Sequence, residues 1–186
     1  MHQDVSIVAI YGKSPRIHES AFIAPGCRII GDVEIGPEAS IWYNCVLRGD
    51  VGRIVIGARS NIQDGTVIHC DSPDPRHPDG FPTLIGEDVL VGHMAMLHGC
   101  VLEDRAFVGL GTIVMNGCVI EGDGMLAAGA LLTPGKRIGA RHLWGGRPAA
   151  FMRELSDNAV SGMHLGVRHY VLNAQAHKRA QACDQI

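Results

Sequence analysis

Two histidines, His69 and His98, each follow directly after an aliphatic residue, and they are 29 residues apart in the chain. A third histidine, His93, precedes His98 by five residues. Three neutral imidazoles suit Zn²⁺, which prefers tetrahedral coordination and keeps one position open in catalytic sites. Water in that position has a pKa of about 7 and supplies hydroxide. These histidines therefore predict a metal site, provided that the fold brings them together.

Histidine alone is weak support for a metal site, because the chain contains ten of them and exposed histidines are common. The other seven are interpreted as surface or packing residues: His2, His18, His77, His142, His164, His169 and His177.

The composition excludes several classes of protein. Charged residues make up 19% of the 186 residues and the formal net charge is −3, so there is no basic footprint for nucleic acid. Hydrophobic residues reach 46%, too many for a disordered chain. No apolar stretch approaches the roughly 20 residues of a membrane span. The length suits one domain, and 24 glycines with 5% aromatic residues favour small equal core layers and frequent tight turns.

The N-terminus lacks the basic region of a signal peptide, so we expect a cytoplasmic location. The six cysteines include no C-x-x-C pair. In a reducing compartment they are expected to be free thiols that pack as small hydrophobes.

A six-residue repeat runs through most of the chain and must position these histidines. A small residue often lies four positions after the aliphatic one, as Cys27 does after Ile23. A helical period of 3.6 fits the pattern badly. The aliphatic positions are Ile17, Ile23, Ile29, Ile35, Ile41, Leu47, Ile56, Ile62, Ile68, Ile85, Val91, Leu97, Leu102, Val108, Val114, Ile120, Leu126, Leu132 and Ile138.

The repeat predicts a parallel β-helix over residues 1–148. Each hexad makes one short strand and one corner, and three hexads close a triangular coil of about eighteen residues. The aliphatic residue points inward, and stacked coils create the core that one coil cannot form alone. Glycines on the turn side, such as Gly57 and Gly109, are expected to supply positive φ at the corners. An antiparallel β-sandwich, the alternative, would need irregular strand spacing with hairpin turns.

Two insertions interrupt the register. Three extra residues lie near 51–53, and eleven lie after Ile68, where prolines, Asp and Gly predict a protruding loop over about 70–82. Past Ile138 the register stops, and Gly145-Gly146-Arg147-Pro148 breaks the pattern. A helix is expected over 149–182, packed back along the solenoid and capped by Asp157. Its apolar stripe is Val160, Met163, Val167, Tyr170, Val171 and Ala174.

The repeat also predicts which histidines meet. Without the eleven inserted residues, His69 and His98 are eighteen residues apart, so they stack on adjacent coils about 4.8 Å apart. Arg48 joins this column by the same arithmetic. His93 lies on the previous side of its coil and cannot easily reach the pair within one chain, but a neighbouring subunit around a threefold axis could supply it. Gln63 lies on that side, one coil below His93.

Four segments resemble the γ-class carbonic anhydrase family of left-handed β-helix hexapeptide proteins. They read W-Y-N-C-V-L-R-G-D at 42–50, N-I-Q-D-G-T-V-I-H at 61–69, G-H-M-A-M-L-H-G at 92–99 and G-R-P-A at 146–149. The resemblance covers roughly residues 12–175. It implies a left-handed coil, which the spacing alone cannot show.

The resemblance also implies roles for individual residues. His69 and His98 would bind the metal from one subunit and His93 from its neighbour. Gln63 would orient the metal hydroxide, and Asn61 would help to position CO₂.

Four further residues have alternative interpretations. Arg48 and Asp50 would form the intersubunit ion pair that holds the trimer, or they have a purely structural role. Tyr170 would match an active-site tyrosine, or it is a buried residue of the helix stripe. Cys70, beside His69, is a candidate ligand whose side chain is expected to point elsewhere.

The chain departs from the family at the insertion after Asp50. The founding type has an acidic loop there that is thought to shuttle protons, whereas residues 51–53 contain no carboxylate. A shuttle needs a positioned group with a pKa near neutrality. Candidates in the long loop are Asp71, Asp74, His77 and Asp79.

The leading functional prediction is a homotrimeric enzyme that hydrates CO₂ to bicarbonate reversibly with a metal-bound hydroxide at the subunit interface. Zinc suits the ligands, and imidazole also accepts Fe²⁺ or Co²⁺. The alternatives are an acyl-CoA thioester hydrolase and a non-catalytic, metal-stabilised trimeric scaffold. Acyl transfer fits less well, because three interface histidines replace a single catalytic base.

Overall fold

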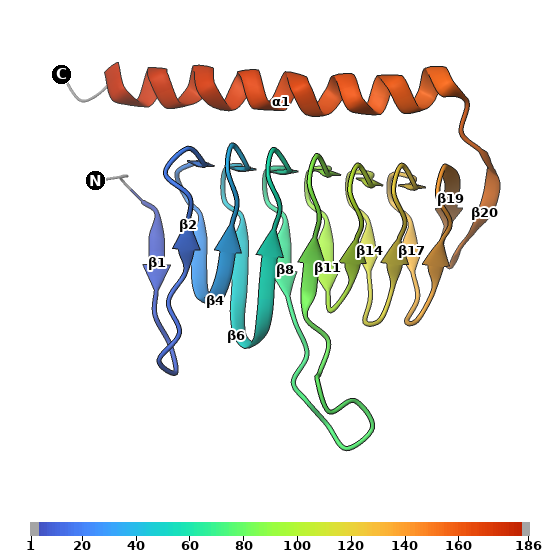
Figure 1. Ribbon diagram of the computed structural model, residues 1–186, viewed down its shortest axis with the longest axis horizontal. Helices are drawn as coiled ribbons and strands as arrows, with labels where there is room; N and C mark the ends of the chain where they lie inside the picture. The colour runs from blue at the N-terminus through green and yellow to red at the C-terminus, as the bar shows by residue number, and fades with distance from the viewer. Residues whose placement is uncertain (1–3, 184–186) are drawn as a thin grey trace.

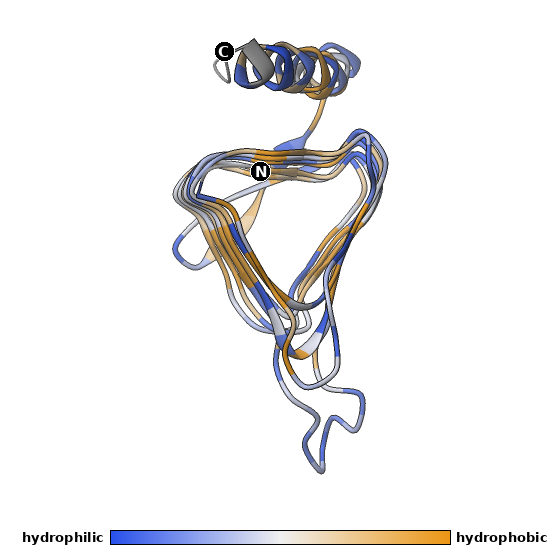
Figure 2. Ribbon diagram, turned by 90° about the vertical axis from the view of Figure 1, so that its left-hand side faces the viewer, coloured by the Kyte–Doolittle hydropathy of each residue, from blue (hydrophilic) through white to orange (hydrophobic). Residues whose placement is uncertain are grey.

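The computed structural model describes residues 4–183 and shows short strands that wind into a triangular solenoid with one long helix (Figures 1 and 2). The parallel β-helix predicted from the repeat is confirmed. Paired positions on neighbouring coils of the regular part of the solenoid are seventeen or eighteen residues apart, as for Leu97 and Val114 or Val101 and Val119.

The strands lie on three faces of the prism, and β4 and β6 bend from the first face onto the second. The first face contains β1 (Ser6–Val8), the first part of β4 (Arg28–Ile35) and of β6 (Val46–Ile56), β8 (Val67–His69), β11 (Met96–His98), β14 (Ile113–Val114) and β17 (Leu131–Leu132). The second contains β2 (Arg16–Ile17), the remainder of β4 and β6, β9 (Thr83–Ile85), β12 (Val101–Leu102), β15 (Val119–Ile120) and β18 (Arg137–Ile138). The third contains β3 (Phe22–Ile23), β5 (Ser40–Ile41), β7 (Asn61–Ile62), β10 (Leu90–Val91), β13 (Phe107–Val108), β16 (Met125–Leu126), β19 (His142–Gly146) and β20 (Ala149–Glu154).

The core consists of stacked aliphatic residues, one from each face of each coil. Ile68 and Leu97, which precede the two column histidines, are both fully buried and pair across adjacent coils. Small residues such as Thr66 and Ala95 fill the narrow positions beside them and are also buried. Because these side chains point inward, the residue that follows each of them points outward.

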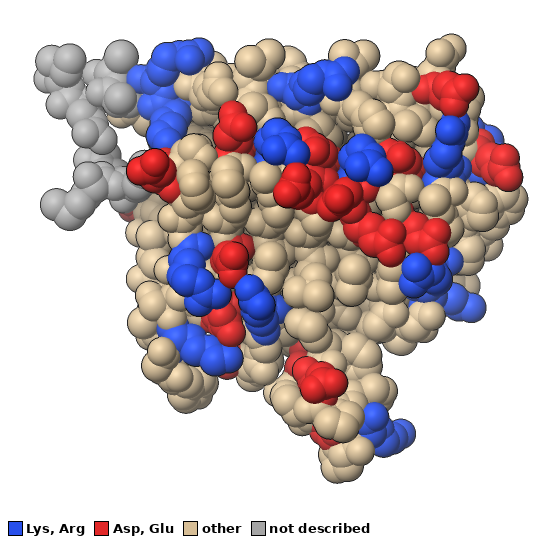
Figure 3. Space-filling view, in the orientation of Figure 1, with Lys and Arg blue, Asp and Glu red and all other residues tan. Residues whose placement is uncertain are grey.

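Glycine has a different role from the one expected at Gly57. A Cβ atom there would lie 2.4 Å from the backbone of Gly86, so glycine permits close stacking of successive coils. Positive φ occurs instead at the middle of the turns, where glycine alternates with polar residues such as Arg59 (φ +60°) and Asp88 (φ +56°). These two side chains form an ion pair with a 2.7 Å contact. Acidic and basic side chains lie side by side along this edge, where the second face meets the third (Figure 3).

Both insertions occur where expected. The pairing of β4 with β6 shifts from Gly31–Gly49 to Val33–Ile54, so the offset grows from eighteen to twenty-one residues. The long loop leaves β8 and returns to β9 at the corner between the first and second faces, away from the helix (Figures 1 and 2).

The prediction of a helix from residue 149 was wrong at its start. β20 folds back antiparallel on β19 and covers an edge of the third face, and α1 spans Asp157–Cys183. A proline at 148 and the positive φ of Gly146 (+98°) suit this turn. Ser156, rather than Asp157, caps α1, because its hydroxyl accepts from the Ala159 N–H.

Helix α1 runs along the third face and contacts β3, β5, β7 and β10 (Figures 1 and 2). Met163, Val167 and Ala174 of the predicted stripe are buried against this face. Among residues 4–183, no helix combines the length and apolar character that crossing a membrane requires.

Candidate metal centre

His69 and His98 are paired residues at the ends of β8 and β11, as the column arithmetic predicts. Nδ1 of His69 lies 3.1 Å from Nε2 of His98. The outer nitrogen of each ring has a separate partner. Nε2 of His69 lies 3.0 Å from Oδ1 of Asp50, and Nδ1 of His98 lies 2.5 Å from Oδ1 of Asn116.

These partners define the tautomers of both rings. A carboxylate only accepts hydrogen bonds, so Nε2 of His69 carries the hydrogen. Nδ2 of Asn116 donates to Asp71 at 2.7 Å, which leaves the Asn116 carbonyl oxygen to accept from Nδ1 of His98. The two inner nitrogens therefore face each other with lone pairs and no hydrogen between them.

This arrangement fits a metal ion. Two lone pairs 3.1 Å apart repel one another unless a cation lies between them. Zn–N bonds of about 2.0–2.1 Å in tetrahedral geometry place two ligand nitrogens roughly 3.3 Å apart. Hydrogen bonding of the outer ring nitrogens to a carboxylate or carbonyl is typical of metal-binding histidines.

His93 lies elsewhere, in the turn between β10 and β11, with its side chain 46% exposed. Its Nδ1 is 2.8 Å from Oδ2 of Asp64, so Nε2 carries the lone pair. Within the part of the chain that the structure describes, no three His, Cys, Asp or Glu side chains gather as a metal site. One protomer thus unites His69 and His98 but not His93.

Asp50 connects the histidine pair to Arg48. Arg48 Nη1 lies 2.6 Å from Oδ2 of Asp50 within the same protomer. Burial alone would raise the pKa of Asp50, but the hydrogen bonds from His69 and Arg48 outweigh it, so this pKa lies below its ordinary value. Asp50 is therefore an anion that accepts from both neighbours. An intersubunit role for Arg48 and Asp50 stays a prediction.

Gln63 and Asn61 lie on the third face, one coil before His93 and beneath α1. Both are buried, and Nε2 of Gln63 donates to Oδ1 of Asn61 at 3.0 Å. Asn61 pairs in register with Leu90, the first residue of the strand that leads to His93. The structure thus groups these two amides with His93 rather than with the His69–His98 pair.

Tyr170 also reaches His93, because an aromatic cluster holds α1 against the third face. The Tyr170 hydroxyl lies 3.5 Å from Nε2 of His93. Its ring meets Trp42 edge-on at 5.3 Å, and Tyr43 hydrogen-bonds to His177 farther along the helix. Burial and then the nearby charge of Asp64 raise the pKa of Tyr170, so its hydroxyl keeps its proton at neutral pH.

Cys70 does not serve the pair. Its side chain is fully buried in the core and therefore points away from His69. Burial raises the pKa of the Cys70 thiol to about 11, so the thiol stays protonated. The prediction that it points elsewhere is confirmed.

The four loop candidates for proton transfer occupy different places. Asp71 contacts Asn116 at the base of the loop. Nδ1 of His77 lies 3.3 Å from Oδ2 of Asp74, and both side chains are about half exposed, at 46% and 49%. Asp79 is exposed.

Asn116 and Asp64 were not predicted, although the offset between coils reaches Asp64 from His93. Asn116 lies eighteen residues after His98, but the coil here advances by seventeen, as the pairing of Leu97 with Val114 shows, so Met115 rather than Asn116 continues the column. Asp64 lies 29 residues before His93, the offset that relates His69 to His98.

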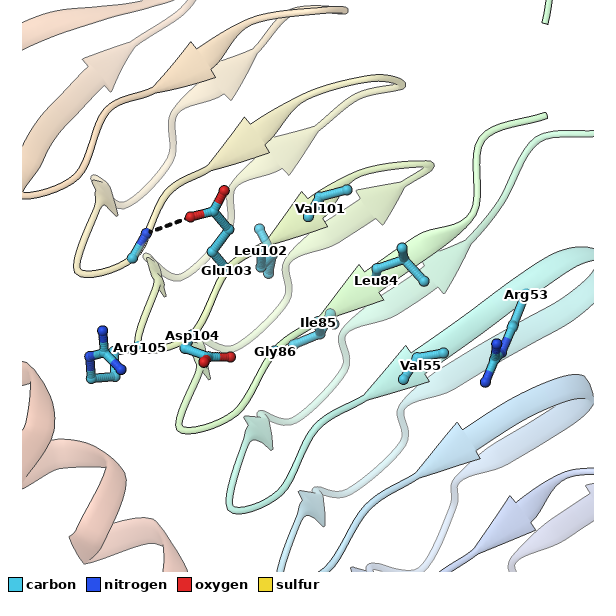
Figure 4. A pocket seen from close by; sticks show the side chains of 11 residues that line it. Arg53, Val55, Leu84, Ile85, Gly86, Val101, Leu102, Glu103, Asp104 and Arg105 are labelled. Atoms are coloured by element: carbon cyan, nitrogen blue, oxygen red, sulfur yellow. Dashed lines mark hydrogen bonds between the residues drawn. The ribbon is translucent and has the colours of Figure 1, made fainter. Parts of the chain in front are cut away.

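A cleft of about 950 Å³ lies beside His98 beneath the long loop. Its lining residues include Asp71, Asp74, His77, Phe81, Met96, Ile113, Met115 and Asn116. A second hollow, of about 610 Å³, lies on the second face (Figure 4). It is lined by Val55, Leu84 and Val101 between Arg53 and Glu103, and it contains no histidine.

Comparisons with known proteins agree with this architecture. The family described as bacterial transferase hexapeptide (six repeats) matches residues 14–49. The chain is 44% identical over 183 residues to mitochondrial gamma carbonic anhydrase 2 of Arabidopsis thaliana, and the match covers 97% of this chain and 66% of that protein. It is 42% identical over 170 residues to a carbonic anhydrase of Geobacillus kaustophilus, covering 91% and 90% of the two chains.

A solved structure shares the whole fold. The crystal structure of a putative acetyltransferase from Bacillus cereus superposes with a TM-score of 0.90 at 37% identity, covering 96% of this chain and 99% of that one. This chain spans 66% of the length of the Arabidopsis relative. The hexapeptide coils and the similarity along nearly the entire chain show that this protein belongs to the γ-class carbonic anhydrase-like family of β-helix proteins.

Proposed function

We propose that this protein is a metal-dependent enzyme that hydrates CO₂ to bicarbonate reversibly, at sites shared between the subunits of a homotrimer. The observation that carries the proposal is the facing of Nδ1 of His69 and Nε2 of His98 at 3.1 Å, with both outer nitrogens hydrogen-bonded. The carbonic anhydrases among the relatives support the choice of reaction.

Two imidazoles from one subunit and Nε2 of His93 from the next would hold the metal. Zn²⁺ suits three nitrogen ligands, and Fe²⁺ or Co²⁺ are further candidates. When bound, such a metal lowers the pKa of coordinated water to about 7 and so supplies a nucleophile at neutral pH.

Apolar surface supports the trimer. Met94 and Leu110 flank the His93 turn with side chains that are 70% and 58% exposed. Met96 and Met115, each 38% exposed, lie in the cleft beside His98. If the His93 turn of one subunit docks in the cleft of its neighbour, this contact buries apolar area and also brings the third ligand to the site.

The amide pair would orient the reactants. Because Gln63 Nε2 donates to Asn61, the Gln63 carbonyl oxygen can accept a hydrogen bond from the attacking water. Hydration releases one proton for each CO₂. The half-exposed imidazole of His77, which lines the cleft, would pass that proton to bulk water.

Thioester hydrolysis is a second candidate, because the structural relative from Bacillus cereus is named a putative acetyltransferase, and both reactions act on an acyl carbonyl. The same activated water would attack the thioester carbonyl.

We place the protein in the cytoplasm, where free thiols persist, because the described cysteines Cys27, Cys45, Cys70, Cys100 and Cys118 are all unpaired and buried.

The test is stopped-flow CO₂ hydration on trimer of known metal content, loaded with zinc or, anaerobically, with iron. We expect turnover well above that of buffer. Gln63→Ala should keep the metal and the trimer but lower kcat roughly 100-fold, as expected for loss of one orienting group. The control is Gln175→Ala, a glutamine of α1 that lines a separate hollow with Ser20 and Lys178.

Buffer-level rates at full metal occupancy would reject CO₂ hydration, and acyl-CoA thioesters would then be assayed on the same protein. An intact trimer that lacks both activities would favour the scaffold.

A further inference from the structure

The long loop is tied to the metal-binding histidines at both of its ends. At its start, Asp71 Oδ2 accepts from Nδ2 of Asn116 at 2.7 Å, and Asn116 accepts from His98. At its end, the hydroxyl of the fully buried Thr83 donates to the carbonyl of His69 at 2.6 Å and accepts from the N–H of Gly99 at 3.0 Å. The start of the loop therefore reaches the His98 ring through Asn116, and the strand residue at its end fixes the backbone of His69.

The base of the loop is itself closed and packed. Asp71 and Phe81 exchange two backbone hydrogen bonds of 3.1 Å. Phe81 lies against Gly99, where a Cβ would come within 2.6 Å of the Phe81 Cβ. The loop base thus rests directly on the residue that follows His98, so Asp71 has a defined position from which to hold Asn116.

We infer that Asp71 and Asn116 are positioning residues that keep His98 protonated on Nδ1, so that its Nε2 faces His69 as a free ligand. The inference rests on the proposed metal site. Without Asn116 the ring would change tautomer. Nε2–H of His98 would then donate to Nδ1 of His69, 3.1 Å away, and the pair would satisfy itself without metal.

The first test reads the tautomer directly in apo-protein by ¹⁵N NMR of the imidazole nitrogens. We expect His98 to carry its proton on Nδ1 in the wild type and on Nε2 in Asn116→Ala. An unchanged tautomer in this variant overturns the inference. Because the measurement needs neither metal nor turnover, its failure is distinct from failure of the proposed enzyme.

The second test measures the Kd for Zn²⁺ by competition with a chelator. Loss of a hydrogen-bond partner of a metal ligand weakens binding roughly 10- to 100-fold, and we expect Asn116→Ala to fall in this range. Asp71→Ala should weaken binding in the same direction. The matched control is Asp79→Ala, which removes the same charge from the same loop at an exposed position.

An exchange of the two side chains separates positioning from charge. In the double variant Asn116→Asp with Asp71→Asn, the new carboxylate at position 116 accepts from His98, and the new amide at position 71 donates to that carboxylate. The chain of hydrogen bonds and the net charge both persist. We expect zinc affinity within a few-fold of wild type, well above that of Asn116→Ala. Equal affinities of Asp71→Ala and Asp79→Ala, or an exchange variant as weak as Asn116→Ala, would overturn the role of the loop.

Discussion

The two histidine-bearing corners of the first face differ in how many side-chain partners hold their imidazole rings and in how exposed those rings are. At one corner, His69 and His98 have side-chain partners on both outer nitrogens, and the His69 side chain is only 17% exposed. At the other, His93 is 46% exposed, with Asp64 as its one close partner and Tyr170 at 3.5 Å. The first corner is complete within one chain, whereas the second projects its ligand outward.

This difference suits the proposed site, in which a solenoid would divide three ligands between two molecules. Adjacent coils place two side chains within about 5 Å, because they stack in register. Residues on different corners of one prism are separated by the width of a face, and no side chain spans that width. In the proposed site the third ligand would therefore come from another molecule, and the corner that supplies it would stay exposed until assembly.

The largest effect is expected from removing the exposed ligand. His93→Ala should lose stoichiometric metal and weaken the trimer, because the site then keeps two ligands. Metal analysis and analytical ultracentrifugation provide the measurement. Full metal occupancy in this variant would contradict the shared site.

Mixing variants sharpens this prediction. His93→Ala and the double variant His69→Ala with His98→Ala should each bind no metal alone. After co-refolding, mixed trimers should regain a single intact site, in which the pair of one subunit meets His93 of another. Absence of metal in isolated mixed trimers would show that the ligands do not come from two chains.

An intermediate effect is expected from the carboxylates that support each corner. The side chain of Asp50 is 18% exposed and that of Asp64 is 40% exposed, so water can replace the hydrogen bond from Asp64 to its histidine more readily. Asp50→Asn should weaken zinc binding by about 10-fold or more, and Asp64→Asn by only a few-fold. Chelator competition measures both, and Arg48→Gln controls for the ion pair that Asp50 also makes. Equal losses of zinc affinity in the two variants would mean that Asp50 and Asp64 support their histidines to the same extent.

The smallest effect is expected at Tyr170. Tyr170→Phe keeps the ring contact with Trp42 and removes a hydroxyl that lies 3.5 Å from His93, at the limit of a hydrogen bond. Zinc affinity should change by less than about 3-fold. A larger loss in the same competition assay would show that α1 builds the His93 corner more firmly than the distance implies.

Much of this architecture was predictable from the spacing of residues. The six-residue repeat predicted the strands, both insertions and the pairing of His69 with His98, and the structure confirms each of them. The offset of 29 residues between neighbouring coils also leads from His93 to Asp64. The hairpin of β19 and β20 was not predicted, because beyond Ile138 the chain leaves the repeat and the apolar stripe of α1 was extended back too far.

By itself the sequence determined which residues share a face and a coil, because a period of six residues converts distance along the chain into position on the prism. It did not determine which atoms meet. The tertiary structure alone decided that Asp50 holds His69, that Asn116 holds His98, and that the base of the long loop reaches Asn116. These contacts depend on side-chain orientation and on the path of an inserted loop, which no periodicity encodes.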